Sequence, residues 1–171
     1  VRLPPGGGIS CRGLGQLLWK ALDLNRTLWA KRDVHSQKET GFYRKDGTTM
    51  QQVTLGRTGI TVNKNGFGAL PIQRVSTDYA GMLLRKAFEA GITYFDTARS
   101  YSDSEEKMGL ALSSVRDKIY IATKTPSTTV EGFWKDLETS LRLLKTDYID
   151  VYQFHNPAFC PKPGDGTGLY E

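Results

Sequence analysis

The sequence predicts an α/β fold in which a parallel β-sheet is covered by helices. From Met50 onward, short apolar stretches alternate with longer stretches whose apolar residues recur at helical spacing. The predicted strands are apolar along their whole length, which is typical of strands buried on both faces of a parallel sheet. Four such strands and three helices fit either a small open sheet or about half of a (β/α)8 barrel, which needs about 250 residues.

The segment 51–68, QQVTLGRTGITVNKNGFG, predicts a β-hairpin that precedes the sheet. Two short alternating stretches flank the turn residues Arg57, Thr58 and Gly59. Four buried strands are then predicted from apolar runs that end at Gly or polar residues. They are GFGALPI (66–72), ITYFDTA (92–98), KIYIATKT (118–125) and YIDVYQFHN (148–156).

Three helices are predicted between these strands. The first, in 76–91, opens on the cap candidates Ser76, Thr77 and Asp78 and ends at Gly91. The second, in 102–114, carries acids in its first turn, where the helix dipole favours them. The third lies in 127–146. The apolar faces predicted for the first and third helices are Met82, Leu83, Ala87 and Phe88, and Val130, Phe133, Trp134, Leu137, Leu141 and Leu144. The remaining stretch, 157–171, is rich in Pro and Gly and predicts a loop.

Residues 1–49 differ from the rest of the chain in charge. They hold nine Lys or Arg and four acids, whereas the other residues hold fourteen of each, so the net charge of +5 comes from this segment alone. Residues 50–171 therefore show no electrostatic footprint for a nucleic acid. An amphipathic stretch in 14–32 could be a targeting or membrane-surface helix, or an arbitrary pattern. We expect 1–49 to be a basic extension, disordered or non-native, and 50–171 to be the main domain.

Two cysteines form neither a disulfide framework nor a metal cluster, so we expect no metal site and a reducing, cytoplasmic location. No run of apolar residues approaches the length of about 18 that a membrane span needs.

Polar side chains follow successive predicted strands. Asp96 ends the second strand, with Tyr101 in the loop behind it; Lys124 ends the third; His155 and Asn156 end the fourth. Each position alone is weak evidence, because turn, cap and solvated residues are common there. Together they would lie at the C-terminal mouth of a barrel, where active sites are found. A tyrosine hydroxyl titrates near pH 10, and a lysine cation beside it stabilises the phenolate. An aspartate can hold that lysine, and a neutral histidine can orient a substrate oxygen, so the set is suited to proton transfer at a carbonyl or an alcohol.

These residues carry a resemblance to a known family. Residues 50–171 resemble the N-terminal half of the aldo-keto reductases, in LGRTGITV, GFGALPI, GITYFDTARSYSDSEEKMG, RDKIYIATK, LETSLRLLKTDYIDVYQFHNP and GDGTGLYE. The resemblance implies the N-terminal half of a (β/α)8 TIM barrel, an NADP(H)-dependent oxidoreductase and a small carbonyl substrate. The segment GALPIQRV resembles a branch whose members often carry a C-terminal iron–sulfur extension.

The resemblance also implies roles for individual residues. Tyr101 would be the general acid that protonates the carbonyl oxygen, with Lys124 beside it and Asp96 paired to Lys124. His155, together with Asn156, would position the substrate. Gly68 and Ala69 would lie near the nicotinamide, and Asp96 would approach the cofactor ribose.

The family's second half supplies further cofactor contacts, so we expect the polypeptide 50–171 to be an incomplete fragment with negligible activity alone. Two alternatives remain open at this point: a nucleotide-binding regulatory module of the same fold without turnover, and a small binding protein that uses its basic N-terminal arm.

Overall fold

The computed structural model describes residues 50–156 and 160–170. The predictions for residues 1–49, including the amphipathic helix, fall outside this described part. Within it, none of the helices combines the length and the apolar character needed to cross a membrane.

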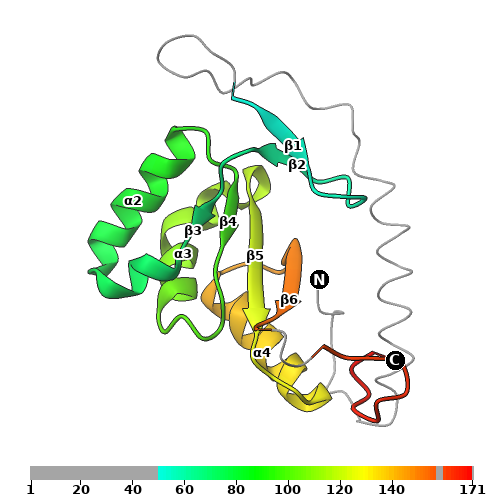
Figure 1. Cartoon of the computed structure of the whole chain (residues 1–171). Coiled ribbons are helices and arrows are strands. Elements are labelled where there is room, and N and C mark those ends of the chain that lie inside the picture. The colour runs from blue at the N-terminus through cyan, green and yellow to red at the C-terminus, as the bar shows by residue number, and fades with distance from the viewer. Residues whose placement is uncertain (1–49, 157–159, 171) are drawn as a thin grey trace.

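Four short parallel strands form the central sheet, in the order β3, β4, β5 and β6 (Figure 1). Their bounds are Phe67–Gly68, Tyr94–Asp96, Tyr120–Thr125 and Val151–Phe154. Each strand therefore lies beside the next strand along the chain. A doubly wound sheet would reverse its strand order at a switch point, so the observed order is that of a barrel wall.

The register of the sheet decides which side chains share a face. Asp96 of β4 lies opposite Ala122 of β5, and Lys124 lies opposite Gln153 of β6. Since side chains alternate between faces along a strand, Asp96, Ala122 and Lys124 all project from one face. Phe95 and its partner Ile121 project from the other face and are almost completely buried.

The buried face is covered by three helices (Figure 1). They are α2 (Thr77–Glu89), α3 (Ser104–Leu112) and α4 (Val130–Leu143). The Ser76 hydroxyl accepts a hydrogen bond from the Tyr79 amide at the start of α2, and the Thr129 hydroxyl accepts one from the Gly132 amide at the start of α4. Such caps satisfy amides that have no partner within the helix. Gly91 follows α2 with a φ of 90°, a conformation that glycine adopts without steric cost.

The predicted hairpin is confirmed. Strands β1 (Gln52–Thr54) and β2 (Thr61–Asn63) pair in antiparallel fashion, and the Leu55 amide donates to the Ile60 carbonyl across the turn. The Asn63 side-chain amide donates to the Gly91 carbonyl, just before β4 begins. The hairpin is thus attached to the end of the sheet at which the strands begin.

Two local predictions were partly wrong. The first predicted strand, 66–72, contains only the two-residue β3, and the 3-10 helix η2 (Leu70–Arg74) follows it. Pro71 lies in the first turn of η2, where its fixed φ and missing amide fit a helix start rather than a sheet. In α2 the fully buried positions include Ala80 and Leu84, whereas Met82 is only partly buried. A second 3-10 helix, η3 (Ser113–Lys118), extends from α3.

The core lies between the sheet and the helices. Its largest fully buried side chains come from both layers: Phe95, Ile121 and Ile149 on the sheet side, and Leu84, Met108, Leu112, Leu137 and Leu144 on the helix side. The face predicted for α4 is confirmed, since Leu137, Leu141 and Leu144 are buried and Phe133 packs on the rings of Tyr152 and Phe154 of β6.

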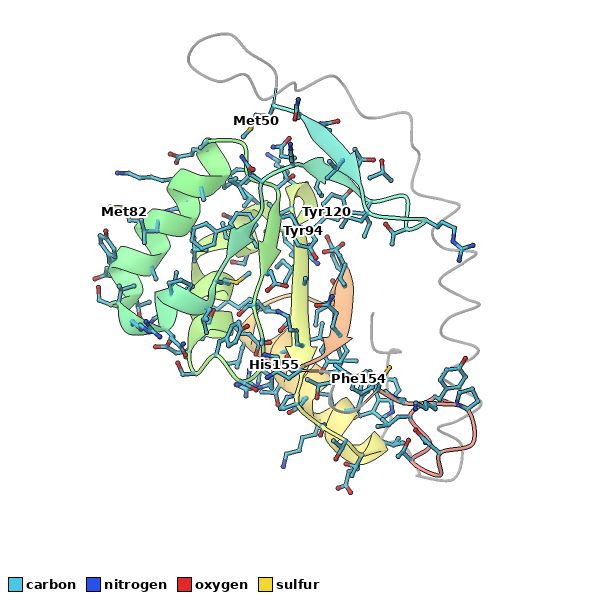
Figure 2. The ribbon with its side chains drawn as sticks, in the orientation of Figure 1. Met50, Met82, Tyr94, Tyr120, Phe154 and His155 are labelled. Carbon is cyan, nitrogen blue, oxygen red and sulfur yellow. The ribbon has the colours of Figure 1, made fainter. Side chains whose placement is uncertain are left out.

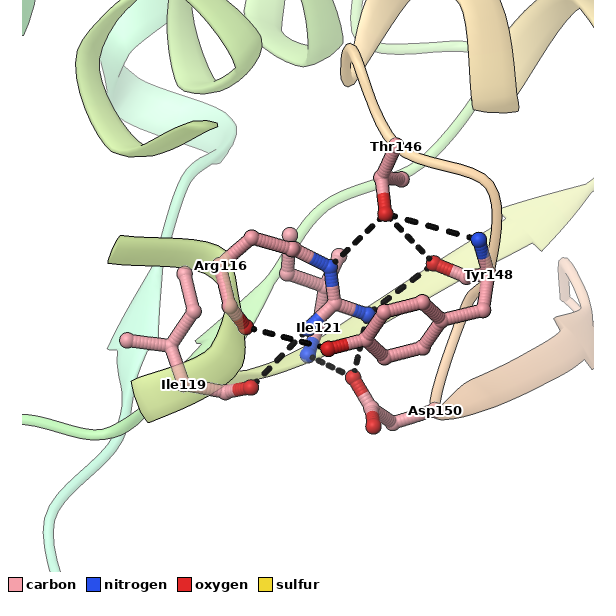
Figure 3. A network of polar contacts seen from close by, with 6 residues as sticks. All are labelled: Arg116, Ile119, Ile121, Thr146, Tyr148 and Asp150. Atoms are coloured by element: carbon pink, nitrogen blue, oxygen red, sulfur yellow. Dashed lines mark hydrogen bonds and ion pairs between the residues drawn. The ribbon is translucent and has the colours of Figure 1, made fainter. Parts of the chain in front are cut away.

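A buried arginine joins the parts of the chain near the start of β5 and β6 (Figure 3). The Arg116 guanidinium forms an ion pair with Asp150 at 2.6 Å and donates to the carbonyls of Ile119 and Tyr148. It also lies 3.8 Å from the centre of the Tyr148 ring. The same Asp150 oxygen accepts from the Ile121 amide. This network therefore links the segment before β5 to the segment before β6.

Candidate active site

The polar residues predicted at strand ends lie together at one edge of the sheet. Asp96 is the last residue of β4, Lys124 lies one residue before the end of β5, and His155 directly follows β6. Figure 2 shows His155 at the end of the sheet toward which β5 runs, far from Tyr94 and Tyr120 at the opposite end. Because the strands are parallel, their carboxyl ends meet at this edge.

Lys124 and Asp96 form an ion pair across neighbouring strands. The Lys124 Nζ lies 2.6 Å from Asp96 Oδ1 and 2.7 Å from the Thr97 carbonyl oxygen. The Lys124 side chain is 17% exposed and that of Asp96 is 33% exposed, so water still reaches the pair. Two acceptors fix the position of the ammonium group, while its exposed side remains available to other groups.

Tyr101 lies beside this ion pair in the loop that follows β4. Its amide donates to the Ala98 carbonyl, and its ring centre lies 5.5 Å from the Lys124 Nζ. This distance is within the range at which a cation interacts with an aromatic ring. The next residue, Ser102, has a φ of 35°, and its hydroxyl contacts the Gln73 side chain. The loop is therefore bent back toward η2, and the bend places Tyr101 over the strand ends.

His155 completes the cluster. Its amide donates to the Thr125 carbonyl of β5, which extends the β5–β6 pairing by one residue. Its ring meets that of Tyr101 edge to face, with centres 5.4 Å apart and an interplanar angle of 83°. Asn156 follows it, is exposed and has a φ of 55°, a left-handed conformation that asparagine tolerates. The structure thus brings Asp96, Lys124, Tyr101 and His155 together and leaves Asn156 at the rim.

Gly68 and Ala69 have different environments although they are neighbours. A Cβ atom built on Gly68 would meet no atom within 4 Å, so the space beside its backbone is open. Ala69 is fully buried, and its amide donates to the Asp96 carbonyl. Of the two positions predicted near the nicotinamide, Gly68 is the accessible one, while Ala69 joins the end of β3 to the end of β4.

The inward face of the sheet below the site holds a second tyrosine. Tyr94 lies two residues before Asp96, and both line a cavity with Gly66, Gly68 and residues of the hairpin. Burial raises the pKa of the Tyr94 phenol above its ordinary value, and the charges of Asp96 and Asp150 raise it further. Tyr94 is therefore harder to deprotonate than an exposed tyrosine.

Sequence reasoning missed a layer of buried polar residues directly behind the site. The hydroxyls of Thr97 and Ser104 lie 2.9 Å apart, and Thr123 donates to Glu105 at 2.7 Å. All four residues are at most 1% exposed. The sequence signal was available: each threonine is adjacent to a predicted site residue, and strand alternation turns it to the opposite face. From the sequence, Glu105 was expected only to interact favourably with the helix dipole.

Comparison with known proteins places the chain among the aldo-keto reductases. The family model for the aldo/keto reductase family matches residues 64–161. L-galactose dehydrogenase from Arabidopsis thaliana is 34% identical over 128 residues, which cover 66% of this chain and 40% of that protein. NADPH-dependent codeinone reductase 1-5 from Papaver somniferum is 32% identical over 121 residues, covering 66% of this chain and 37% of that protein. The chain thus spans about two fifths of the length of these relatives.

Solved structures agree with the fold of the described part. The aldo-keto reductase AKR11C1 from Bacillus halodurans superimposes with a TM-score of 0.58 at 31% identity, covering 62% of this chain and 40% of that one. The parallel sheet and its helices correspond to part of a (β/α)8 barrel, as the sequence predicted. The iron–sulfur extension stays a prediction. On the extent of the family match, the chain belongs to the aldo/keto reductase family.

Proposed function

We propose that this chain contributes the catalytic residues of an NADP(H)-dependent oxidoreductase that reduces aldehydes or ketones to alcohols. The observation that carries the proposal is the convergence of Lys124, Asp96, Tyr101 and His155 at the carboxyl ends of three neighbouring strands. The family supports the reaction class, and one relative carries NADPH dependence in its name.

In the proposed mechanism, Tyr101 donates its hydroxyl proton to the carbonyl oxygen of the substrate. Negative charge then develops on the Tyr101 oxygen, and the Lys124 ammonium beside the ring stabilises this charge. Asp96 and the Thr97 carbonyl hold Lys124 in place. His155, whose ring packs on Tyr101, hydrogen-bonds the carbonyl oxygen and keeps it close to the proton donor.

The residues at the mouth fit a nicotinamide cofactor. A flat ring needs close access to backbone, and the open space at Gly68 provides it. Asp96 is partly exposed on the same face, one strand away, where it can meet a ribose hydroxyl. When bound, NADPH supplies the hydride that reduces the carbonyl carbon. In this proposal Gly68 and Asp96 hold the nicotinamide end of the cofactor, and Asn156 lines the substrate side with His155.

The proposal extends to the organisation of the chain. Residues 50–171 form the reductase part, whereas 1–49 lie outside it, and the protein acts in the cytoplasm on small carbonyl compounds. The four strands of the parallel sheet supply one wall of a barrel, and the family's further cofactor contacts come from its second half. We therefore expect 50–171 alone to show negligible turnover, as an assay of NADPH oxidation by that purified segment would check.

The test removes the hydroxyl group of the proposed acid, Tyr101. Residues 50–156 would be joined to the C-terminal half of the Bacillus halodurans reductase, and the Tyr101→Phe variant compared with the unsubstituted chimera. Loss of the proton donor should lower kcat by about 10³-fold, while NADPH binding, followed by fluorescence, is retained. Undiminished carbonyl reduction by the Phe variant would rule out Tyr101 as the acid. If the folded, unsubstituted chimera binds NADPH without reducing any carbonyl, a regulatory nucleotide-binding module would be the better description.

A further inference from the structure

A buried carboxylate behind the sheet contacts both halves of the candidate site. Glu105, in the first turn of α3, is 1% exposed. One of its oxygens accepts the Thr123 hydroxyl at 2.7 Å, and the other pairs with the Arg99 guanidinium. Thr123 directly precedes Lys124, and Arg99 lies two residues before Tyr101. Neither contact has a place in the mechanism proposed above.

The contacts of Glu105 form a closed ring with the backbone. The Arg99 amide donates to the Lys124 carbonyl at 2.9 Å, and Lys124 is bonded along the chain to Thr123. A path therefore runs from Glu105 through Arg99 and the β5 backbone to Thr123 and back to Glu105. Such a ring resists both sliding of the loop along β5 and rotation of the end of β5.

The environment of Glu105 gives this ring its strength. A buried carboxylate is costly unless each of its oxygens has a partner. If the loop moved away with Arg99, Glu105 would keep only the Thr123 hydroxyl. The pairing of Arg99 with Glu105 therefore penalises loop movement more strongly than an exposed ion pair would, since exposed pairs contribute little.

We propose that Glu105 is a positioning residue that holds the Tyr101 loop and the end of β5 in one fixed arrangement, and thereby sets Tyr101 beside Lys124. Only the catalytic value of this arrangement rests on the proposed function. Glu105 acts through Arg99 and Thr123, and it does not touch the reacting atoms.

Amide hydrogen exchange on the purified chain tests the inference without any need for turnover. The change is Glu105→Gln, which keeps the shape but removes the charge that pairs with Arg99. The matched control is Glu106→Gln, its exposed neighbour on the same helix. We expect the amides of Arg99 and Tyr101 to exchange at least about ten-fold faster in Glu105→Gln than in the control. Amides near the start of the strands, such as those of Tyr120 and Asp150, should change by less than about two-fold.

The Thr123→Val variant provides an independent arm, with Thr123→Ser as its matched control because serine keeps the hydroxyl. We expect the Arg99 amide to exchange faster in the valine variant and at the rate of the unsubstituted chain in the serine variant. Unchanged exchange at Arg99 and Tyr101 in folded variants would overturn the inference. A uniform rise over the whole sheet, or loss of folding in both Glu105→Gln and Thr123→Val, would do the same, because Glu105 would then act on the fold as a whole. Local loss of protection in a protein that proves unable to reduce any carbonyl would support the positioning role and count against the proposed function alone.

Discussion

Lys124 obtains both of its acceptors from the end of β4, one from the Asp96 side chain and one from the Thr97 backbone. This double attachment places a cation 5.5 Å from the centre of the Tyr101 ring. Because a backbone carbonyl cannot be lost by mutation, removal of the Asp96 charge should shift the lysine rather than release it.

The first prediction concerns Asp96→Asn. The variant keeps the Thr97 carbonyl as an acceptor and removes the ionic partner, so Lys124 should be held less firmly beside Tyr101. We expect kcat to fall by about 10²-fold in the chimera described above, with little change in stability because the pair is partly exposed. Steady-state kinetics and urea unfolding would measure the two quantities; an unchanged kcat would show that Asp96 is dispensable for the reaction.

The second prediction concerns alkaline pH. Burial raises the pKa of Tyr152 well above its ordinary value, and burial followed by the charges of Asp96 and Asp150 raises that of Tyr94. In the unfolded chain both phenols titrate near pH 10. As the pH rises above about 10, the unfolded chain loses these protons while the folded protein keeps them, so the unfolded state binds fewer protons and folding stability falls.

Urea unfolding at pH 8 and at pH 10.5 would measure this loss. Tyr152→Phe should make the difference between the two pH values smaller, because one of the two groups no longer titrates. Tyr79→Phe is the control, since Tyr79 is 49% exposed. If the unsubstituted protein and both variants lose the same stability between the two pH values, the loss does not come from the Tyr152 phenol.

The sequence indicated the candidate site residues but not the buried residues that contact them. Asp96, Lys124 and His155 were identifiable because polar residues interrupt apolar strands at corresponding places. Glu105 and its partner Arg99 were not, because charged side chains in a loop or at the start of a helix normally face water. Only the packing of α3 on the sheet shows that Glu105 is enclosed and that Arg99 reaches it.

Helix α3 packs closely against the end of α4 at Gly109. A Cβ atom at this position would overlap the Leu143 carbonyl oxygen and lie 2.8 Å from the Leu144 carbonyl carbon. Both are backbone atoms, so they can yield only if a helix moves. The glycine is therefore required by helix packing rather than by its own backbone conformation.

The third prediction follows from this contact. Gly109→Ala should destabilise the protein by about 1–3 kcal/mol, because overpacking forces the helices apart despite the better helix propensity of alanine. Gly68→Ala is the glycine-matched control for stability, since its Cβ would enter open space. Thermal or urea unfolding would measure the stability of both variants. Equal stability would show that α3 and α4 adjust freely.

Helix positions were predictable from caps and periodicity, and strand lengths were not. Ser76 and Gly91 bracket α2 closely, because capping is a local interaction. The stretch GFGALPI was expected to be one strand, but its residues from Leu70 onward belong to η2. A short apolar run carries no period that separates a strand from a helical turn, and here Pro71 decides the outcome.

In the whole molecule, the two ends of the sheet have different roles. The end where the strands begin carries the Arg116–Asp150 network, whose side chains are 9% and 3% exposed. The end where they finish carries the candidate site with its partly exposed ion pair. Residues at the start of barrel strands generally serve stability, and those at the carboxyl ends serve chemistry. The barrel order was predictable from alternation, whereas the Arg116 network depends on long-range contacts that no sequence pattern marks.

The fourth prediction separates these roles. Asp150→Asn leaves the buried Arg116 without its ionic partner and should cost about 3 kcal/mol of folding stability. The exposed neighbour Asp117, changed to Asn, should alter stability by less than about 0.5 kcal/mol. Denaturant unfolding would compare them, and a similar small effect for both would show that the network is not a major source of stability.

In the proposed mechanism Tyr101 and Lys124 act as one unit in proton transfer. The most direct measurement is a double-mutant cycle on kcat/KM for carbonyl reduction, with Tyr101→Phe, Lys124→Met and the double variant made in the chimera. If Lys124 acts by stabilising charge on Tyr101, its removal has no further effect once the hydroxyl is gone, so the double variant should be about as slow as Tyr101→Phe alone. Losses that simply multiply would rule out this coupling, because they would show that the two residues contribute independently.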